Sequence, residues 1–238
     1  LHNDRTNCDP FLLANCPSWK TDMLGVGIAW LRVSLKFDAA KYPNGIPNIK
    51  ATVRGTKVYD PRDKAMKWSS NAALVILDYY RTVLGVPDSD LNWDQFKAAA
   101  NICDEQVLTA AGTYEARYSV SGKFELTEAP AKILESLHDA CAGAPTFTGG
   151  KHGILVGAYY GPALDEIHDY QLAGDVKIVP ETAMRDRTNT ITGTFVDPAQ
   201  NYSETDYPSV SVAEWVDEDG GEVTSDLNQR FVTSSYQA

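Results

Sequence analysis

The chain has 238 residues, 43% of them hydrophobic, and its 32 Asp and Glu against 21 Lys and Arg give a formal charge of −11 and a pI of about 4.8. This length allows one large or two small folded domains. The negative charge opposes contacts with phosphates, and Lys and Arg are scattered singly, so specific nucleic-acid binding is not expected. No stretch approaches the roughly 18–20 apolar residues of a membrane-spanning helix, and no signal peptide is evident. We therefore expect a soluble, unsecreted protein without a membrane segment and, because it begins at Leu1 rather than Met, a segment of a longer chain.

Cysteine spacing indicates neither a zinc site nor a disulfide scaffold. The four cysteines, Cys8, Cys16, Cys103 and Cys141, include no C-x-x-C pair. Cys103 and Cys141 fall on the apolar sides of expected helices, where a free thiol behaves as a small hydrophobic group. Only Cys8 and Cys16 invite a disulfide, and so few cysteines favour free thiols in a reducing compartment.

The first regular pattern in the chain is an alternation typical of strands. Over residues 31–37, Leu, Val and Phe alternate with polar residues, which predicts a half-buried strand. After the turn Pro43–Gly45 the alternation returns over residues 49–54, and Gly55-Thr56 is a two-residue hairpin loop leading into residues 57–59. These segments predict a small antiparallel unit.

Two helices are expected next. Ser69 or Ser70 is the expected N-cap of a helix whose apolar residues keep helical spacing as far as Leu84, before a glycine and a proline end it. Asn92 and Gln95 resemble a capping box, and the residues after them place a tryptophan, a phenylalanine, an alanine and a cysteine on one helical face.

Two hairpins and a third helix follow. Strands over residues 118–126 are expected to turn at Ser121-Gly122, and Thr127 is the expected N-cap of the third helix. Another hairpin, over residues 146–160, turns at Gly149-Gly150 and is expected to pack on that helix.

Beyond Gly161 helical periodicity is absent, which predicts a mainly β portion. The candidate strands there are 176–179, 190–196, 210–216 and 222 onward.

The fold class expected from these elements is α+β, with antiparallel hairpins and about three helices followed by a mainly β portion. Three parts are expected: an extended arm over residues 1–25, a hairpin and two-helix portion over 26–112, and a hairpin–helix–hairpin unit over 113–238 that continues into the β portion.

No catalytic, cofactor-binding or metal-binding residue is assigned from the sequence. The four histidines, His2, His138, His152 and His168, lie in no recognisable triad context. His138 follows Glu135 on one helical face, but one carboxylate and one imidazole cannot hold a metal, so a satisfied or surface histidine is expected.

Two loops superficially resemble ion-binding motifs. The glycine-rich turn 149–153 has neither P-loop nor dinucleotide-binding spacing, so a hairpin loop is expected. The acidic run 217–222 lacks the register of a calcium-binding loop, so a solvated loop is expected. Paired carboxylates for glycoside hydrolysis remain open because their separation is a three-dimensional property, and the dispersed tryptophans indicate core or interface packing.

Several ordered motifs resemble the central region of the tail tip proteins of long-tailed phages, the family of the lambda host-specificity protein J. They span roughly residues 27–212. The motifs are Tyr42-Pro-Asn-Gly-Ile-Pro47, Lys57-Val-Tyr-Asp-Pro-Arg62, Asn71-Ala-Ala-Leu74, Leu77-Asp-Tyr-Tyr80, Leu84-Gly-Val-Pro87, Phe96 with Ala98-Ala-Ala-Asn-Ile-Cys-Asp104, Met184-Arg-Asp-Arg-Thr-Asn189, Gly193-Thr-Phe-Val-Asp-Pro198 and Asn201-Tyr202.

The resemblance implies a structural hub in the virion tail tip, assembled in the bacterial host cytoplasm. Such a hub is a homotrimer around the tail axis that closes the tail tube and gates release of the tape measure protein and DNA. Its partners are other tail tip, tail tube and tape measure proteins, and the host receptor through regions outside this segment. The resemblance implies no catalytic residues. A receptor- or carbohydrate-binding module and a tail-associated wall hydrolase remain the alternatives.

Overall fold

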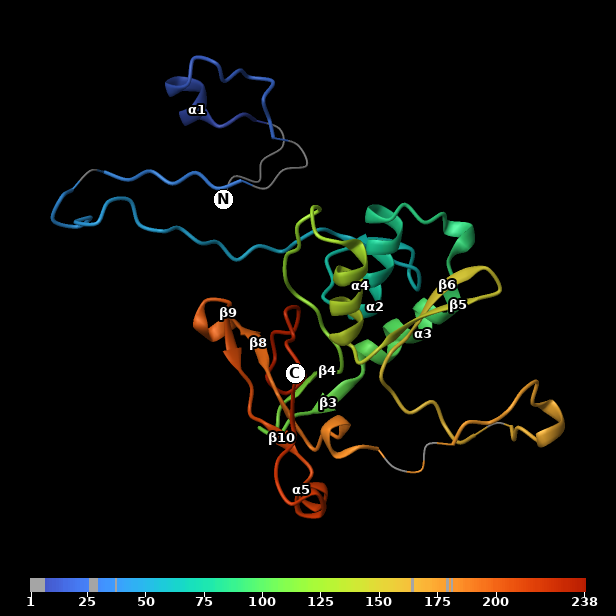
Figure 1. Cartoon of the computed structure of the whole chain (residues 1–238). Coiled ribbons are helices and arrows are strands. Elements are labelled where there is room, and N and C mark those ends of the chain that lie inside the picture. The colour runs from blue at the N-terminus through green and yellow to red at the C-terminus, as the bar shows by residue number, and fades with distance from the viewer. Residues whose placement is uncertain (1–6, 26–29, 37, 164, 179, 181) are drawn as a thin grey trace. The chain divides into compact units, whose positions relative to one another are not determined.

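The computed structural model describes residues 7–25, 30–36, 38–163, 165–178, 180 and 182–238 (Figure 1). The chain divides into two compact units, Leu1–Val53 and Arg54–Ala238. Short helices and small, mostly antiparallel sheets alternate along the chain, which confirms the α+β class. The predicted boundary at residue 112 falls inside a hairpin that joins β3 (Gln106–Leu108) to β4 (Tyr114–Ala116).

The first unit contains one short helix, α1 (Pro10–Asn15), in the segment expected to be an extended arm. Asp9 is its N-cap and accepts hydrogen bonds from the amides of Phe11 and Leu12, both at 2.9 Å. Arg32 forms an ion pair with Asp9, and its guanidinium lies 4.6 Å from the centre of the Phe11 ring. The short helix is therefore held to a residue far along the chain.

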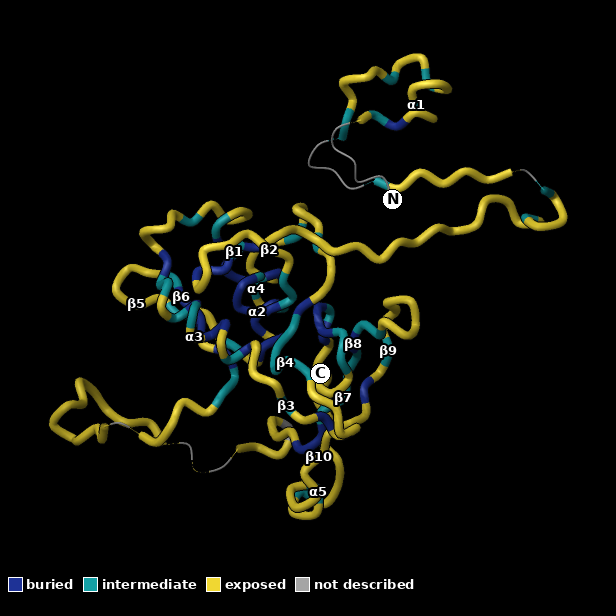
Figure 2. Tube along the Cα trace, turned by 180° about the vertical axis from the view of Figure 1, so that it is seen from behind, coloured by how far each residue is buried: buried dark blue, intermediate teal, exposed yellow. Residues whose placement is uncertain are grey.

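The hairpin predicted between residues 31–37 and 49–54 is wrong for the described residues. Neither 31–36 nor 46–56 belongs to a strand, and residue 37 lies outside the described part. Leu31, Val33 and Leu35 remain exposed. A two-stranded hairpin with no apolar surface to cover is marginal in water, so alternation alone does not form it. Figure 2 shows residues 31–36 and 43–57 as exposed along their length.

The second unit is built on three helices and a hairpin. α2 (Ala72–Asp78) continues into a π-helical turn, η1 (Tyr79–Val83), and packs on α3 (Trp93–Asp104) and α4 (Pro130–Asp139). β5 (Ala144–Thr148) and β6 (Lys151–Leu155) form the predicted hairpin, which contacts α4 and α3. The largest buried side chains of this core are Phe96, Leu74, Ile76, Leu77, Leu91, Ile133 and Ile154.

All three predicted helices are confirmed, but two of their N-caps are not. Asn71 rather than a serine caps α2, with its side chain accepting from the Leu74 amide at 3.2 Å. Asn92 caps α3 as predicted, although Gln95 instead accepts a hydrogen bond from Thr146. α4 begins at Pro130, a residue whose missing N–H suits the first helical position, and has no side-chain cap.

The partners of the short strands differ from prediction. β1 (Val58–Asp60) pairs with β2 (Ala65–Lys67) rather than with residues 49–54. The hairpin expected over 118–126 is absent, because the amide of Val120 donates to the Ser70 carbonyl and that of Ser121 to the Phe231 carbonyl. This segment therefore joins the start of α2 to the C-terminal residues.

The β portion is a three-stranded sheet and a separate hairpin. β7 (Thr190–Thr192) lies between antiparallel β10 (Val210–Ser211) and parallel β11 (Thr224–Asp226), while β8 (Thr194–Asp197) pairs with β9 (Ser203–Asp206). Short 3₁₀ helices lie between the other elements: η2 (Asp88–Asp90), η3 (Asp169–Gln171), η4 (Met184–Asp186) and η5 (Pro198–Gln200).

One strand prediction in this portion is wrong, and the strand predicted over 210–216 is confirmed only at Val210–Ser211. Residues 176–178 form no strand, and residue 179 lies outside the described part. Residues 213–216 belong to a helix, α5 (Ala213–Asp219), which ends at Gly220 in the left-handed conformation. Residues 217–219 of the acidic run are therefore the end of this helix, and residues 220–222 form the loop that follows it. Within the described ranges no helix has the length and apolar character needed to cross a membrane.

Gly193 is the tightest backbone contact of the β portion. A Cβ atom there would lie 1.9 Å from the Leu227 carbonyl oxygen, which is backbone and cannot rotate away. We expect Gly193→Ala to lower the free energy of unfolding by about 1–3 kcal/mol, the usual range for overpacking. Urea denaturation measures this, and Gly174→Ala, where a Cβ would meet nothing within 4 Å, is the matched control. An equal loss in both variants would contradict the expectation.

Candidate interaction site

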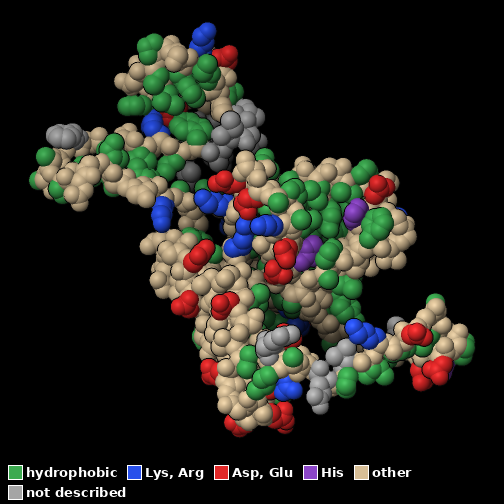
Figure 3. All heavy atoms as spheres, viewed as in Figure 1, with side chains coloured by type: hydrophobic (Ala, Val, Ile, Leu, Met, Phe, Trp, Pro, Cys, Tyr) green, Lys and Arg blue, Asp and Glu red, His purple; other side chains and the backbone are tan. Residues whose placement is uncertain are grey.

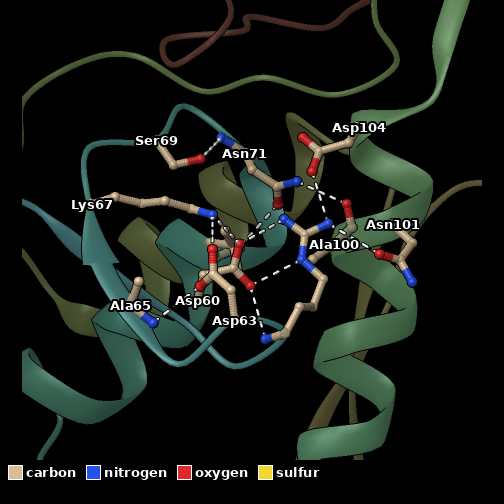
Figure 4. Close-up of polar contacts among 11 residues, drawn as sticks. Asp60, Asp63, Ala65, Lys67, Ser69, Asn71, Ala100, Asn101 and Asp104 are labelled. Carbon is tan, nitrogen blue, oxygen red and sulfur yellow. Dashed lines mark hydrogen bonds and ion pairs between the residues drawn. The ribbon is translucent and has the colours of Figure 1, made fainter.

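A buried carboxylate, Asp60, organises the largest group of charged side chains in the second unit (Figure 4). Asp60 ends β1, and its side chain is only 1% exposed. Arg62 donates to both of its oxygens, from Nε at 2.9 Å and from Nη2 at 2.8 Å, and Lys67 Nζ lies 3.0 Å away. These hydrogen bonds, those of Arg62 above all, hold the pKa of Asp60 well below its ordinary value. The carboxylate is therefore ionised near neutral pH and is a weaker base than an ordinary aspartate.

Arg62 also fastens the β1–β2 hairpin to α3. Its Nη1 donates to Asn101 Oδ1 at 3.0 Å and lies 2.8 Å from Asp104 Oδ2. The two carboxylates raise the pKa of Arg62 above its already high ordinary value. A guanidinium that donates two hydrogen bonds to one carboxylate has a fixed orientation, and because Arg62 also contacts α3, it fixes the orientation of the hairpin on α3.

One further contact completes the group that we call the Asp60 cluster: Asp60, Arg62, Asp63, Lys67, Asn101 and Asp104. Lys67 also pairs with Asp63 at 2.6 Å, on the exposed side of the hairpin. Beside the cluster, Asn71 donates to the Ala100 carbonyl at 2.8 Å and so joins the start of α2 to α3. The Asp60 cluster thus lies directly after residue 57, where the extended segment ends and β1 begins.

The histidines named in the sequence lie on separate elements. His138 is buried in α4; its Nδ1 donates to the Leu134 carbonyl at 2.7 Å, whereas Nε2 has no hydrogen-bond partner among the described residues. Burial lowers the pKa of His138, which keeps the ring neutral. His152 lies between the rings of Tyr80 and Phe147, and His168 stacks on Tyr170. Glu135 is exposed.

His138 makes stability depend on pH. Its pKa in the folded chain is below the ordinary value, so the unfolded chain binds the proton more readily as pH falls below about 6.5. We expect the free energy of unfolding to fall by up to about 1 kcal/mol between pH 6.5 and 5.5. His138→Phe should remove this part of the slope in urea denaturation, whereas His168→Gln, at an exposed position, should leave it. A slope that persists in His138→Phe would contradict the assignment.

The two loops that resemble ion sites have other roles. Gly149 and Gly150 form the turn of the β5–β6 hairpin with φ of +62° and +77°, as expected for that turn. Asp219 at the end of α5 pairs with Arg187 at 2.7 Å and accepts from Asn189 at 3.1 Å, which lowers its pKa. The described residues contain no group of three potential metal ligands of the His, Cys, Asp and Glu types.

All four cysteines are free. Cys103 and Cys141 are buried, as predicted, and burial raises their pKa to about 11 and about 12, so neither is a reactive thiolate near neutral pH. Cys8 and Cys16 are half-buried and form no disulfide.

The C-terminal residues close the helical core. Phe231 and Val232 are buried in it, and Gln237 donates from Nε2 to the carbonyls of Ser119 at 2.9 Å and Ala140 at 2.8 Å. A cavity of about 260 Å³ lies beside Gln237, next to the end of α4.

Exposed apolar side chains form a surface feature that no catalytic motif in the sequence indicates. They gather on two stretches outside the compact core, residues 30–57 and 157–187, which Figure 2 shows as almost continuously exposed. The strongly exposed examples are Ile46, Ile49, Val53, Tyr159, Tyr160, Ile167, Tyr170, Val176, Ile178 and Met184. The strand-like alternation over 31–37, 49–54 and 176–179 was the sequence signal for these surfaces.

No protein-family model matches the chain, and no curated protein matches it significantly. The resemblance to phage tail tip proteins therefore stays a prediction.

Proposed function

We propose that the chain is a structural component of a phage or prophage tail tip hub, which closes the distal end of the tail tube and supports host recognition and genome release. In this proposal the full-length protein is a homotrimer around the tail axis and contacts other tail tip, tail tube and tape measure proteins. The motifs quoted above suggest this family, and one feature of the structure supports an assembly role.

That feature is the apolar surface of the two extended stretches. Tyr170 is 83% exposed and Ile178 is 79% exposed, in a segment whose neighbours are also exposed. Single exposed apolar residues are ordinary, but contiguous ones mark surfaces that a partner covers. Covering them removes apolar area from water at roughly 25 cal/mol per Å², so neighbouring subunits stabilise such segments.

The charged side chains of the Asp60 cluster also serve structure. In the Asp60 cluster the carboxylates and cations are joined in ion pairs that fix a hairpin on a helix. Functional carboxylates of hydrolases, by contrast, need one member with a raised pKa to donate a proton. Asp60 has the opposite shift.

Electron microscopy of virus-like particles, labelled with antibodies against this chain, tests the proposal. Particles released by the bacterium that encodes the chain should carry the label at the tip of the tail. Label on no particle, together with turnover of peptidoglycan by the purified chain, would replace the proposal with a hydrolase. Binding of the purified chain to host envelope material without particle label would favour a receptor- or carbohydrate-binding module.

A further inference from the structure

Two segments of the chain carry opposite charge. Residues 30–57 contain six Lys and Arg and a single Asp. Residues 188–229, which hold the whole β portion, contain nine Asp and Glu and no Lys or Arg. The chain as a whole is acidic, so the net positive charge of residues 30–57 is opposite in sign to that of the whole chain.

The basic segment has the side-chain pattern of a strand. In an extended chain successive side chains point to opposite faces, so Ile49 and Val53 share one face and Lys50 and Arg54 the other. Ile49 is 45% exposed and Val53 is 63% exposed, and residues 46–56 are in no strand of the described part. We call residues 46–57 the basic arm. The basic arm ends at residue 57, directly before β1 and the Asp60 cluster.

The β portion offers a matching surface. β10 is an edge of the sheet, where Val210 is 63% exposed, and Trp215 is exposed on the adjoining α5. The amide of Val212 donates to Asn189 beside β7, so the preceding backbone amide, that of Ser211, faces away from the sheet. An open edge with apolar side chains is a template for an added strand.

Acidic residues lie on both sides of this edge in the sequence. Asp206, Glu214, Asp217 and Glu218 are all exposed, and Figure 3 shows acidic side chains over the part of the molecule that carries α5. We call residues 206–218 the acidic edge. Carboxylates beside an apolar edge repel another acidic segment and attract a cationic one, which decides between possible strands.

We propose that the basic arm of one copy of this chain docks on the acidic edge of a second copy. Apolar residues of the arm, Ile49 and Val53, would cover Val210 and Trp215, and Lys50 and Arg54 would face the carboxylates. A contact between two different surfaces is head-to-tail, and it closes a ring where the rotation between neighbours returns to the first subunit, so that each subunit gives an arm to the next. The proposal rests on the proposed function, because it requires several copies side by side.

Charge reversal of each surface in the full chain tests this docking. One variant carries Lys50→Glu and Arg54→Glu, the other Glu214→Lys and Asp217→Lys. In sedimentation at low salt, the unchanged chain should self-associate, and each variant alone should associate at least about 10-fold more weakly. Mixing the two variants should raise association above that of either variant alone, since each arm then finds an edge of opposite charge on the other variant; recovery in a ring of three should be partial, because one of its three contacts still joins two copies of the same variant.

The control for the arm variant carries Lys123→Glu and Lys151→Glu, which make the same charge change as Lys50→Glu with Arg54→Glu at exposed positions outside both surfaces. It should associate like the unchanged chain. A mixture that associates no better than its components, or a control that weakens equally, would overturn the docking. If the label is found at the tail tip but the unchanged chain is monomeric in sedimentation, the docking is overturned and the proposed function stands. If mixing rescues association but no particle carries the label, the docking stands and the proposed function is overturned.

Discussion

Replacing Phe96 by alanine should lower the free energy of unfolding of the second unit by about 3–5 kcal/mol, the range for removing a buried aromatic side chain. Phe96 is fully buried on α3 and meets the Tyr80 ring edge-on, with the ring centres 6.2 Å apart. Alanine there leaves a cavity that the surrounding helices can only partly close. Urea denaturation followed by circular dichroism measures the loss, which is a large fraction of the 5–15 kcal/mol typical of a folded protein.

Phe147→Ala is the matched control for this change. Phe147 lies on β5 with most of its side chain in water, so its truncation should cost far less. Similar losses in the two variants would show that the helical core does not have the packing described.

Replacing Asp60 by asparagine should lower the free energy of unfolding by about 2–3 kcal/mol at pH 7, because the change leaves the partly buried Arg62 without its main partner. The effect should depend on pH with a definite sign. The pKa of Asp60 is depressed in the folded chain, so its contribution is fully present above the ordinary pKa of about 3.9. It is lost as pH falls below that value.

The difference in the free energy of unfolding between Asp60→Asn and the unchanged chain should therefore become smaller when urea denaturation is repeated at pH values from 5 down to 2. Asp63→Asn, which removes an exposed partner of Lys67, should change stability little at any pH. Hydrogen exchange gives a second reading: amides of β1 and β2 should exchange faster in Asp60→Asn only. A gap that stays constant with pH would contradict the role given to the Asp60 carboxylate.

Local signals predicted the helices well. In α3, the Asn92 side chain accepts from the Gln95 amide at 3.2 Å, and the helical face predicted from spacing supplies Phe96 and Cys103 to the core. Capping and helical periodicity involve residues within a few positions of one another, so they can be read from one stretch of sequence. The error at α2 was small, since Asn71 is next to the serines expected to cap it.

Strand partners could not be predicted in the same way. Alternation over residues 31–37 indicates that one face is to be covered, but it does not say by which segment. Val58 and its neighbours did form a strand, though they pair forward with residues 65–67 rather than backward. Gly122 was read as a turn residue, whereas it lies against Phe231, where a Cβ would be 2.6 Å from the ring.

The sequence by itself determined the α+β class, the three core helices, the burial of Cys103 and Cys141 and the β5–β6 hairpin, because each follows from short-range periodicity, turns and hydrophobicity. Only the tertiary structure decided that Arg62 joins Asp60 to Asp104 on α3, that His138 is buried, and that the segments over 31–36 and 46–56 have no strand partner in the described chain. Such contacts depend on which distant segments meet in space, and that is settled by the packing of the whole core.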